Sequence, residues 1–168
     1  MTRTLALLLL GASLPLASCG LRPLYGAGAS SATAQSLGMI EVTPIDERSG
    51  WLLRNALVDR LAVAGGADSP RYRLDVLIDD DITKFGLRGD AGATRERRTL
   101  RARYQLIDLA TGETLVDATA GSDAGIDITS SPYATVAAEQ SAVERLSMEV
   151  ADDIVARLAL YFDRTARR

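Results

Sequence analysis

The sequence contains no histidine and only one cysteine, Cys19. Without histidine, the chain has no imidazole to activate a serine or a cysteine in a catalytic triad, and Cys/His zinc sites are excluded. A single cysteine also rules out an intrachain disulfide. Glycine-rich phosphate loops and the G-x-S-x-G nucleophile motif are missing as well. We therefore expect a protein that is not an enzyme and that holds neither a cofactor nor a metal ion.

The chain also lacks an excess of positive charge. Its 168 residues include 19 Lys+Arg and 22 Asp+Glu, which gives a net charge of −3. Proteins that bind nucleic acids through phosphate contacts need a positive potential, so we expect no nucleic-acid partner. Hydrophobic residues make up 47% of the chain, a share that excludes a wholly disordered protein, and the length favours a single domain.

The N-terminus has the pattern of a secretion signal. Arg3 precedes an apolar stretch, Leu5–Leu16, which is too short to cross a bilayer because a spanning helix needs about 20 residues. The stretch runs into Leu16-Ala17-Ser18-Cys19, which resembles the lipobox at which bacterial lipoproteins are acylated and cut. We expect residues 1–18 to be removed and Cys19 to hold the protein on a membrane through its acyl chains.

Residues 19–36 are rich in Gly, Ala and Ser, and this composition predicts a flexible tether. Within it, Arg22-Pro23 favours an extended backbone, and Leu24 and Tyr25 are large apolar groups close to the anchor. Two interpretations of this segment stand side by side. Its apolar side chains rest on the chain's own domain, or they dock on a partner.

The rest of the chain, residues 37–168, alternates between strand and helix patterns. Period-two and helical spacings predict the order β-α-β-β-β-α. The strands are expected at Leu37–Ile45, Tyr72–Ile78, Thr94–Leu109 and Thr114–Ala120, and the helices at Trp51–Ala64 and from Pro132 onward. We expect an α+β, two-layer sandwich in which two amphipathic helices pack on one face of a four-stranded, mostly antiparallel sheet.

One predicted strand carries a row of arginines on the face away from the helices. Side chains two residues apart on a strand share a face, which places Arg95, Arg97, Arg101 and Arg103 together. Each guanidinium can bind a phosphate or a carboxylate through two hydrogen bonds, so the row is a candidate contact for an anionic ligand. The opposing interpretation is that Asp75 and Asp79, on the preceding strand, neutralise part of the row across the sheet.

Two motifs, taken together, resemble a known family. Cys19-Gly20-Leu21-Arg22-Pro23-Leu24-Tyr25-Gly26 follows the lipobox, and Ser131-Pro132-Tyr133-Ala134-Thr135-Val136-Ala137-Ala138-Glu139-Gln140 opens the last helix. The pair, in this order and at this chain length, is similar to LptE of the alphaproteobacterial type, a lipopolysaccharide-assembly lipoprotein of the outer membrane. Gly20, rather than Asp, after the acylated Cys resembles the outer-membrane sorting pattern.

The resemblance implies a function and a partner. LptE-like proteins bind the β-barrel protein LptD, assist its assembly, sit partly in its lumen as a plug and contact lipopolysaccharide, without making or breaking a bond. The arginine row is then the candidate contact for the anionic groups of lipopolysaccharide. It implies a lipid-anchored protein on the periplasmic side of the outer membrane. Arg22, Pro23, Leu24, Tyr25 and Tyr133 are the candidate barrel contacts, although Tyr133 has a second interpretation, as an anchor of the helix start in the core. The alternative function is an auxiliary lipoprotein of a lipid-transport ABC system.

Overall fold

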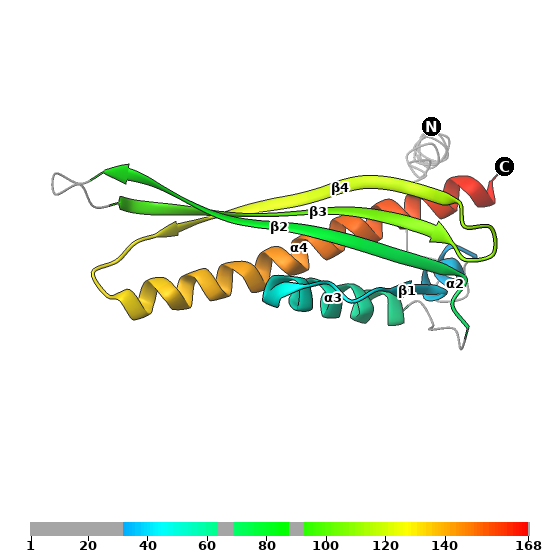
Figure 1. The fold of residues 1–168 in the computed structure, drawn as a ribbon, viewed down its shortest axis with the longest axis horizontal. Coiled ribbons are helices and arrows are strands. Elements are labelled where there is room, and N and C mark those ends of the chain that lie inside the picture. The colour runs from blue at the N-terminus through cyan, green and yellow to red at the C-terminus, as the bar shows by residue number, and fades with distance from the viewer. Residues whose placement is uncertain (1–31, 64–68, 88–92, 168) are drawn as a thin grey trace, which may run out of the picture.

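A computed structural model describes residues 32–63, 69–87 and 93–167, so the signal, Cys19 and the segment Arg22–Tyr25 lie outside the described residues. The elements follow the order α-β-α-β-β-β-α (Figure 1). They are α2 (Ala32–Gly38), β1 (Ile40–Val42), α3 (Glu47–Ala62), β2 (Tyr72–Leu87), β3 (Ala93–Asp108), β4 (Thr114–Asp127) and α4 (Pro132–Ala166).

The four strands form one mixed sheet in the order β1-β2-β3-β4. β1 pairs with β2 in parallel, because α3 returns the chain to the same end of the sheet before β2 begins. β2, β3 and β4 then follow as an antiparallel meander, with β2 and β3 in register from Tyr72↔Asp108 to Leu87↔Ala93. The expected four-stranded, mostly antiparallel sheet is confirmed.

Helices α3 and α4 lie on one face of this sheet (Figure 1). At 1.5 Å per residue the 35 residues of α4 span about 52 Å, and the 16 residues of β2 reach a similar length at about 3.3 Å each. The longest helix therefore runs beneath the full length of the strands, and the molecule is elongated. We call the sheet surface that α3 and α4 cover the helix face, and the opposite surface the outer face.

The core lies between the helix face and the two long helices. The fully buried side chains of the core come from the helical and period-two patterns of the sequence. Their burial between sheet and helices confirms the expected two-layer sandwich. Near the C-terminus, the rings of Tyr72 and Phe162 meet with centroids 5.1 Å apart. The fully buried aliphatic groups include Leu53, Leu57, Leu74, Leu100, Leu106, Leu146, Ile154 and Leu158.

Two strands are longer than their sequence pattern predicts. β2 continues past Ile78 to Leu87, and β4 continues past Ala120 to Asp127. On β2 the apolar alternation ends there because Asp80 and Lys84 stand on the helix face. On β4 it is only interrupted at Ser122 and resumes with the buried Ala124 and Ile126. The strand hydrogen bonding nevertheless continues, since it depends on the backbone rather than on the side chains.

The region before β1 also differs from the prediction. Where the end of the tether and the first residues of a strand were expected, the chain forms α2, and β1 has only three residues. Alanine is the strongest helix former, and Leu37, only 2% exposed, gives the short helix a place in the core against α4. Composition alone did not separate an alanine-containing helix from a flexible linker.

Candidate functional site

The arginine row lies on the outer face, as the period-two pattern predicts. The side chains of Arg95, Arg97, Arg101 and Arg103 are exposed, whereas the even-numbered positions between them face the helices. The prediction of one shared face is therefore confirmed by the strand geometry. Whether these guanidinium groups are available to a ligand depends on their neighbours.

Aspartates of β4, rather than those of β2, pair with three of the four arginines. Arg95 Nε lies 2.9 Å from Asp127 Oδ1, and Arg103 Nη2 lies 2.9 Å from Asp117 Oδ2. Arg97 is held more loosely, with its Nε 3.9 Å from the nearest carboxylate oxygen of β4 and its guanidinium 5.6 Å from a ring centroid of β2. The expected acid Asp75 is bound instead by an arginine of its own strand, through a contact of 3.0 Å.

Asp117 is the most strongly held acid of the outer face. It accepts hydrogen bonds from Arg103, at 3.1 and 2.9 Å, and from Gln105 Nε2, at 2.8 Å. The hydrogen bond from Arg103, followed by that from Gln105, lowers the pKa of Asp117 to about 2. This carboxylate therefore stays charged, and able to pair with Arg103, throughout the physiological pH range.

Arg101 differs from the other members of the row. Among the described residues it forms no ion pair within 4.0 Å, although Asp79 lies opposite it in the register with β2. On its other side stands Gly121, where a Cβ would meet Arg101 Cγ at 3.2 Å. The absence of a side chain at Gly121 leaves room for the arginine stem, so Arg101 is the member of the row most open to an anionic ligand.

On β2 and β3 alone, the outer face has more arginines than aspartates. Acids of β4 outweigh that excess once the third strand is counted. The arginines of the outer face are Arg73, Arg95, Arg97, Arg101 and Arg103, and its aspartates are Asp75, Asp79, Asp81, Asp117, Asp123 and Asp127. Sequence reasoning missed Asp123 and Asp127 because their strand was expected to end at Ala120, and it missed Asp117 because only the acids of the preceding strand were counted.

Charged residues also occupy the helix face where the sheet extends beyond α3. Arg98 Nη2 lies 2.6 Å from Asp80 Oδ2, and these side chains are only 16% and 8% exposed. Glu96, 1% exposed, lies 3.2 Å from the amino group of Lys84. Arg98 also donates to the backbone oxygen of Glu139 at 3.2 Å, which links these charged side chains to α4. We call the four charged residues and Glu139 the polar layer.

The polar layer shifts the proton affinities of its acids. Burial raises the pKa of Asp80, but the hydrogen bonds from Arg98 and Ser49 outweigh it, so the net pKa lies below the usual value. Burial, followed by the nearby carboxyl of Glu96, raises the pKa of Glu139. The sequence signal for this layer was charge at strand positions that share parity with the apolar core.

The first turns of α4 are nearly free of contacts with the rest of the domain. Tyr133 is 89% exposed and Val136 is 59% exposed. The interpretation of Tyr133 as an anchor of the helix start in the core is therefore wrong. Its side chain points into solvent because α4 begins beyond the main core. We call Tyr133 and Val136 the α4 tip.

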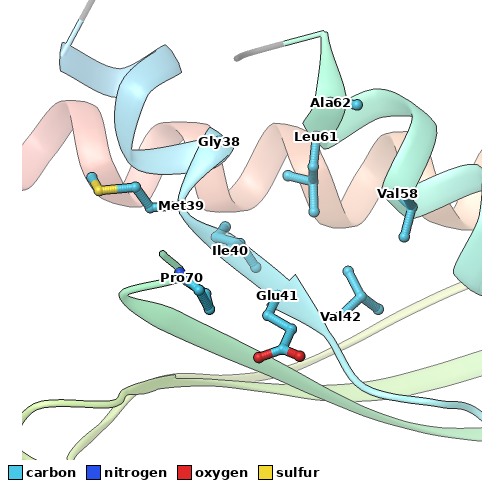
Figure 2. Close-up of a pocket in the computed structure, with 9 residues that line it drawn as sticks. All are labelled: Gly38, Met39, Ile40, Glu41, Val42, Val58, Leu61, Ala62 and Pro70. Atoms are coloured by element: carbon cyan, nitrogen blue, oxygen red, sulfur yellow. The ribbon is translucent and has the colours of Figure 1, made fainter. Parts of the chain in front are cut away.

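A groove runs between the edge strand β1 and α3 (Figure 2). Its volume is about 320 Å³, and most of its lining is apolar. Ile40 and Val42 face the helix side of the groove, whereas Glu41 points away from that side. The other lining residues are Gly38, Met39, Val58, Leu61, Ala62 and Pro70, and we call the whole the β1 groove.

Neither a metal site nor a membrane span emerges from the described part of the chain. No three acidic or cysteine side chains gather there in a way that would hold a metal ion. Within the same residues, no helix is long and apolar enough to cross a bilayer. The surfaces that remain are those suited to binding: a charged sheet face, an apolar helix tip and an apolar groove.

Solved structures share this architecture. A lipoprotein of Caulobacter crescentus is 26% identical, with a TM-score of 0.63, over 81% of this chain and 98% of that one. Rare lipoprotein B of Shewanella oneidensis is 11% identical, with a TM-score of 0.60, over 76% and 98%. A minor lipoprotein of Acinetobacter baumannii is 13% identical, with a TM-score of 0.57, over 72% and 90%. No curated protein matches the sequence.

The fold and its surfaces thus define a small two-layer α/β domain of the type found in bacterial lipoproteins. Residues 37–158 match the model of the LptE family, described as lipopolysaccharide-assembly. The chain belongs to the LptE family, and is a non-enzymatic lipoprotein of lipopolysaccharide assembly. The family and the absence of enzymatic activity expected from the sequence are both confirmed by this match.

Proposed function

We propose that the protein is anchored through acyl chains on Cys19 to the periplasmic side of the outer membrane, where it binds an LptD-type β-barrel as assembly partner and plug. Membership of the LptE family is the observation that carries this proposal. The elongated shape supports it, because a molecule about 50 Å long can reach into a barrel lumen while one end stays near the membrane surface (Figure 1).

The α4 tip is the proposed barrel contact. An exposed tyrosine and valine on one helix end offer apolar area that solvent does not favour, and aromatic side chains are enriched in protein interfaces. The N-terminal candidates Arg22–Tyr25 lie outside the described residues. They precede Ala32, which belongs to the α2 that packs beside the other end of α4 (Figure 1). Ten residues of extended chain reach about 35 Å, less than the length of α4.

Lipopolysaccharide is the second proposed partner, and Arg101 is the proposed first contact. Lipid A carries phosphate groups, and an arginine without an ion pair binds such a group without first releasing a carboxylate. The other three arginines of the row would have to exchange Asp117, Asp123 or Asp127 for the ligand. The row therefore binds phosphate at one position first and at the others by competition.

Purification of the acylated protein in detergent, with the bound partner identified by mass spectrometry, tests the proposal. We expect an outer-membrane β-barrel to co-purify, and a photo-crosslinker at Tyr133 to attach to the inner wall of that barrel. A crosslinker at Leu160, 42% exposed near the other end of α4, is the matched control. Co-purification with an inner-membrane permease, and no barrel, would instead support the ABC-system alternative and overturn the proposal.

A further inference from the structure

The longer part of β2 has an edge without a neighbouring strand. β1 lies beside only the first residues of β2, and their register ends at Val42↔Leu74 (Figure 1). Thr43 N still donates to Leu74 O at 3.2 Å, and the chain then leaves the sheet to enter α3. Among the described strands, none lies on this side of β2 after Leu74.

The backbone groups of this edge form a regular row. Tyr72 N and Leu74 O bond to the β1 side, so the even-numbered residues of β2 point their N–H and C=O groups away from β3. The register with β3 is continuous up to Phe85, without a bulge that would turn the edge away. The row spans about 26 Å at 3.3 Å per residue. Its members are Val76, Ile78, Asp80, Ile82 and Lys84.

The opposite edge of the sheet is different. β4 is that edge strand, and Arg157 of α4 donates through Nη1 to Thr119 O at 2.8 Å, which occupies an outward carbonyl in the middle of the strand. Within the described residues, no contact of this kind reaches the outward backbone groups of residues 76–84. A long, regular and uncovered edge pairs readily with an extended segment of another protein.

Both faces of the free edge also offer apolar side chains. Leu77 is 75% exposed on the outer face, and Ile82 is 36% exposed on the helix face. A hollow of about 480 Å³ lies at the start of the edge, between Thr43 and Pro44 on one side and Leu77 on the other. A strand added along β2 would therefore bury apolar area on both faces and place its first side chain in this hollow.

The charges beside the edge decide which strand fits. Asp79 and Asp81 are exposed on the outer face, and among the described residues neither forms an ion pair within 4.0 Å. Asp81 accepts only a hydrogen bond from Thr83, at 2.8 Å. Opposite charges in cross-strand positions stabilise a pairing, and like charges weaken it. A second copy of β2, paired antiparallel about residues 79–81, would place aspartate beside aspartate, whereas a basic strand would pair with both acids.

We propose that the edge of β2 from Val76 to Lys84 docks an extended segment of a partner protein, in which arginine or lysine alternates with aliphatic residues. The segment adds a strand to the sheet, in line with β1. Its aliphatic side chains lie toward Ile78 and Ile82, and its basic side chains lie beside Asp79 and Asp81. The inference goes beyond the proposed function and does not depend on the identity of the barrel.

A peptide of this pattern tests the site on the full acylated chain in a non-ionic detergent. The probe is fluorescein-Gly-Val-Arg-Val-Arg-Val-Thr-amide, and its binding is measured by fluorescence polarisation. We expect saturable binding, weakened about tenfold in Asp79→Asn/Asp81→Asn by the loss of two cross-strand charge pairs. Asp59→Asn/Glu144→Gln makes the same change of net charge at exposed positions of α3 and α4 and should bind as the wild type does. No saturable binding, or equal losses in both variants, overturns the proposal.

Alternate N-methylation of the peptide tests backbone pairing separately from charge. Only every second amide of an added strand faces β2, whichever way the strand runs. One peptide is methylated on its valines and a second on its arginines. We expect one of them to lose binding and the other to keep it. Loss in both peptides, or in neither, would mean that the peptide does not bind as a strand.

A proline on the protein side makes the same test. Ile82→Pro removes an N–H that points away from β3, so it breaks no ladder hydrogen bond, and it should lose peptide binding. Gly125→Pro, at a β4 position whose N–H also faces away from β3, is the matched control and should bind normally. Urea unfolding of both variants shows whether they are folded. Normal binding by a folded Ile82→Pro protein overturns the proposal.

Hydrogen exchange locates the bound peptide and needs no variant. A saturating amount of the peptide should slow exchange at the outward amides of Ile78, Asp80 and Ile82. The outward amides of Gly121 and Asp123, on β4, should keep their rates. Slower exchange on β4 alone, or unchanged exchange on β2, would place the peptide elsewhere and overturn the inference.

Discussion

Arg98 of β3 and Asp80 of β2 form an ion pair on the helix face of the sheet, with Arg98 Nη2 2.6 Å from Asp80 Oδ2 and a second contact, from Nε to Oδ1, of 2.8 Å. The two parallel contacts make a bidentate pair, and both side chains are largely hidden from solvent. Arg98 also donates to the backbone of α4. The pair therefore links the far half of the sheet to the first half of α4, where apolar packing has thinned out.

Removing one partner of this pair should weaken the fold more than removing both. Asp80→Ala leaves a largely buried guanidinium without its carboxylate, for which we expect a loss of about 3 kcal/mol in the free energy of unfolding. The double variant Asp80→Leu/Arg98→Met keeps the volume apolar and should lose clearly less. Urea unfolding measures both. Equal losses in the single and the double variant would mean that the pair does not stabilise the structure in this way.

Protonation of Asp80 at low pH should break its ion pair with Arg98. Because the pKa of Asp80 is lowered in the folded state, its contribution is present above the unfolded value, near 3.8, and is lost as the pH falls through the lowered value. The stability of the wild-type protein should therefore drop below pH 4 more steeply than that of the double variant. Parallel pH profiles for the two proteins would contradict this assignment.

Glu139 has the opposite pH dependence. Its pKa is raised by burial first and by the neighbouring Glu96 next, so the folded state holds this proton more tightly than the unfolded state does. The protonated Glu139 carboxyl stabilises the fold fully below the pKa of the unfolded state, near 4.5. This stabilisation is lost as the pH rises through the raised pKa of the folded state.

Glu139→Gln should remove this loss. The variant is expected to gain stability relative to the wild type as the pH rises above about 4.5, and chemical unfolding at several pH values measures the difference. Glu144→Gln, at an exposed position of the same helix, is the matched control and should follow the wild-type profile. A difference that does not change with pH would show that the Glu139 side chain acts through packing rather than through its proton.

The arginine row should bind phosphate unevenly. Arg101→Gln removes the guanidinium that has no ion pair in the described structure, and we expect it to weaken binding to vesicles that carry lipopolysaccharide by about tenfold, equal to about 1.4 kcal/mol. Arg95→Gln removes an arginine already paired with Asp127 and should have a smaller effect.

Removing an aspartate of the outer face should strengthen the binding to lipopolysaccharide vesicles instead of weakening it. Asp117→Asn releases Arg103 and should strengthen the same binding, measured by co-sedimentation at fixed ionic strength because surface electrostatics depend on salt. Equal losses for Arg101→Gln and Arg95→Gln, with no change in Asp117→Asn, would exclude the outer face as the lipopolysaccharide site.

Sequence patterns predicted the parts of the fold that apolar side chains define. The stripe through Leu146, Ile154 and Leu158 and the alternation through Leu100 and Leu106 are both buried as expected. Patterns did not predict the far halves of β2 and β4, because polar side chains interrupt the apolar alternation of both strands, although β4 resumes it at Ala124 and Ile126. The arginine row was placed on the correct face, but its partners were assigned to the wrong strand, since the acids of β4 were not counted and two of them lie beyond the expected end of that strand.

The exposed and the contact-poor residues were harder to predict, because exposure is a property of the tertiary structure. Tyr133 follows a proline at a helix start, a position that is equally common in a core and on a surface. Only the length of α4 beyond the apolar core shows that this side chain is in solvent. The same holds for Arg101, whose freedom depends on Gly121 in a neighbouring strand.

Gly50 provides a test in which local propensity and tertiary packing have opposite signs. It lies inside α3, where Gly→Ala ordinarily stabilises a helix by about 1 kcal/mol. Here a Cβ would lie 2.7 Å from Ile45 Cγ2 and 3.0 Å from the Ile45 carbonyl carbon, and the backbone atom has no rotamer by which to move away. Overpacking of this kind costs about 1–3 kcal/mol, so Gly50→Ala should destabilise the domain.

The matched control is Gly125→Ala, because a Cβ at that position of β4 meets nothing within 4 Å. Urea unfolding should show little change for this control and a lower midpoint, with the same slope, for Gly50→Ala. The double variant Gly50→Ala/Ile45→Ala should recover less than the full loss, since it relieves the side-chain contact but leaves the carbonyl contact and removes a buried group. A Gly50→Ala protein more stable than the wild type would mean that α3 is free to move away from Ile45, and that the loop before it does not hold the helix against β1.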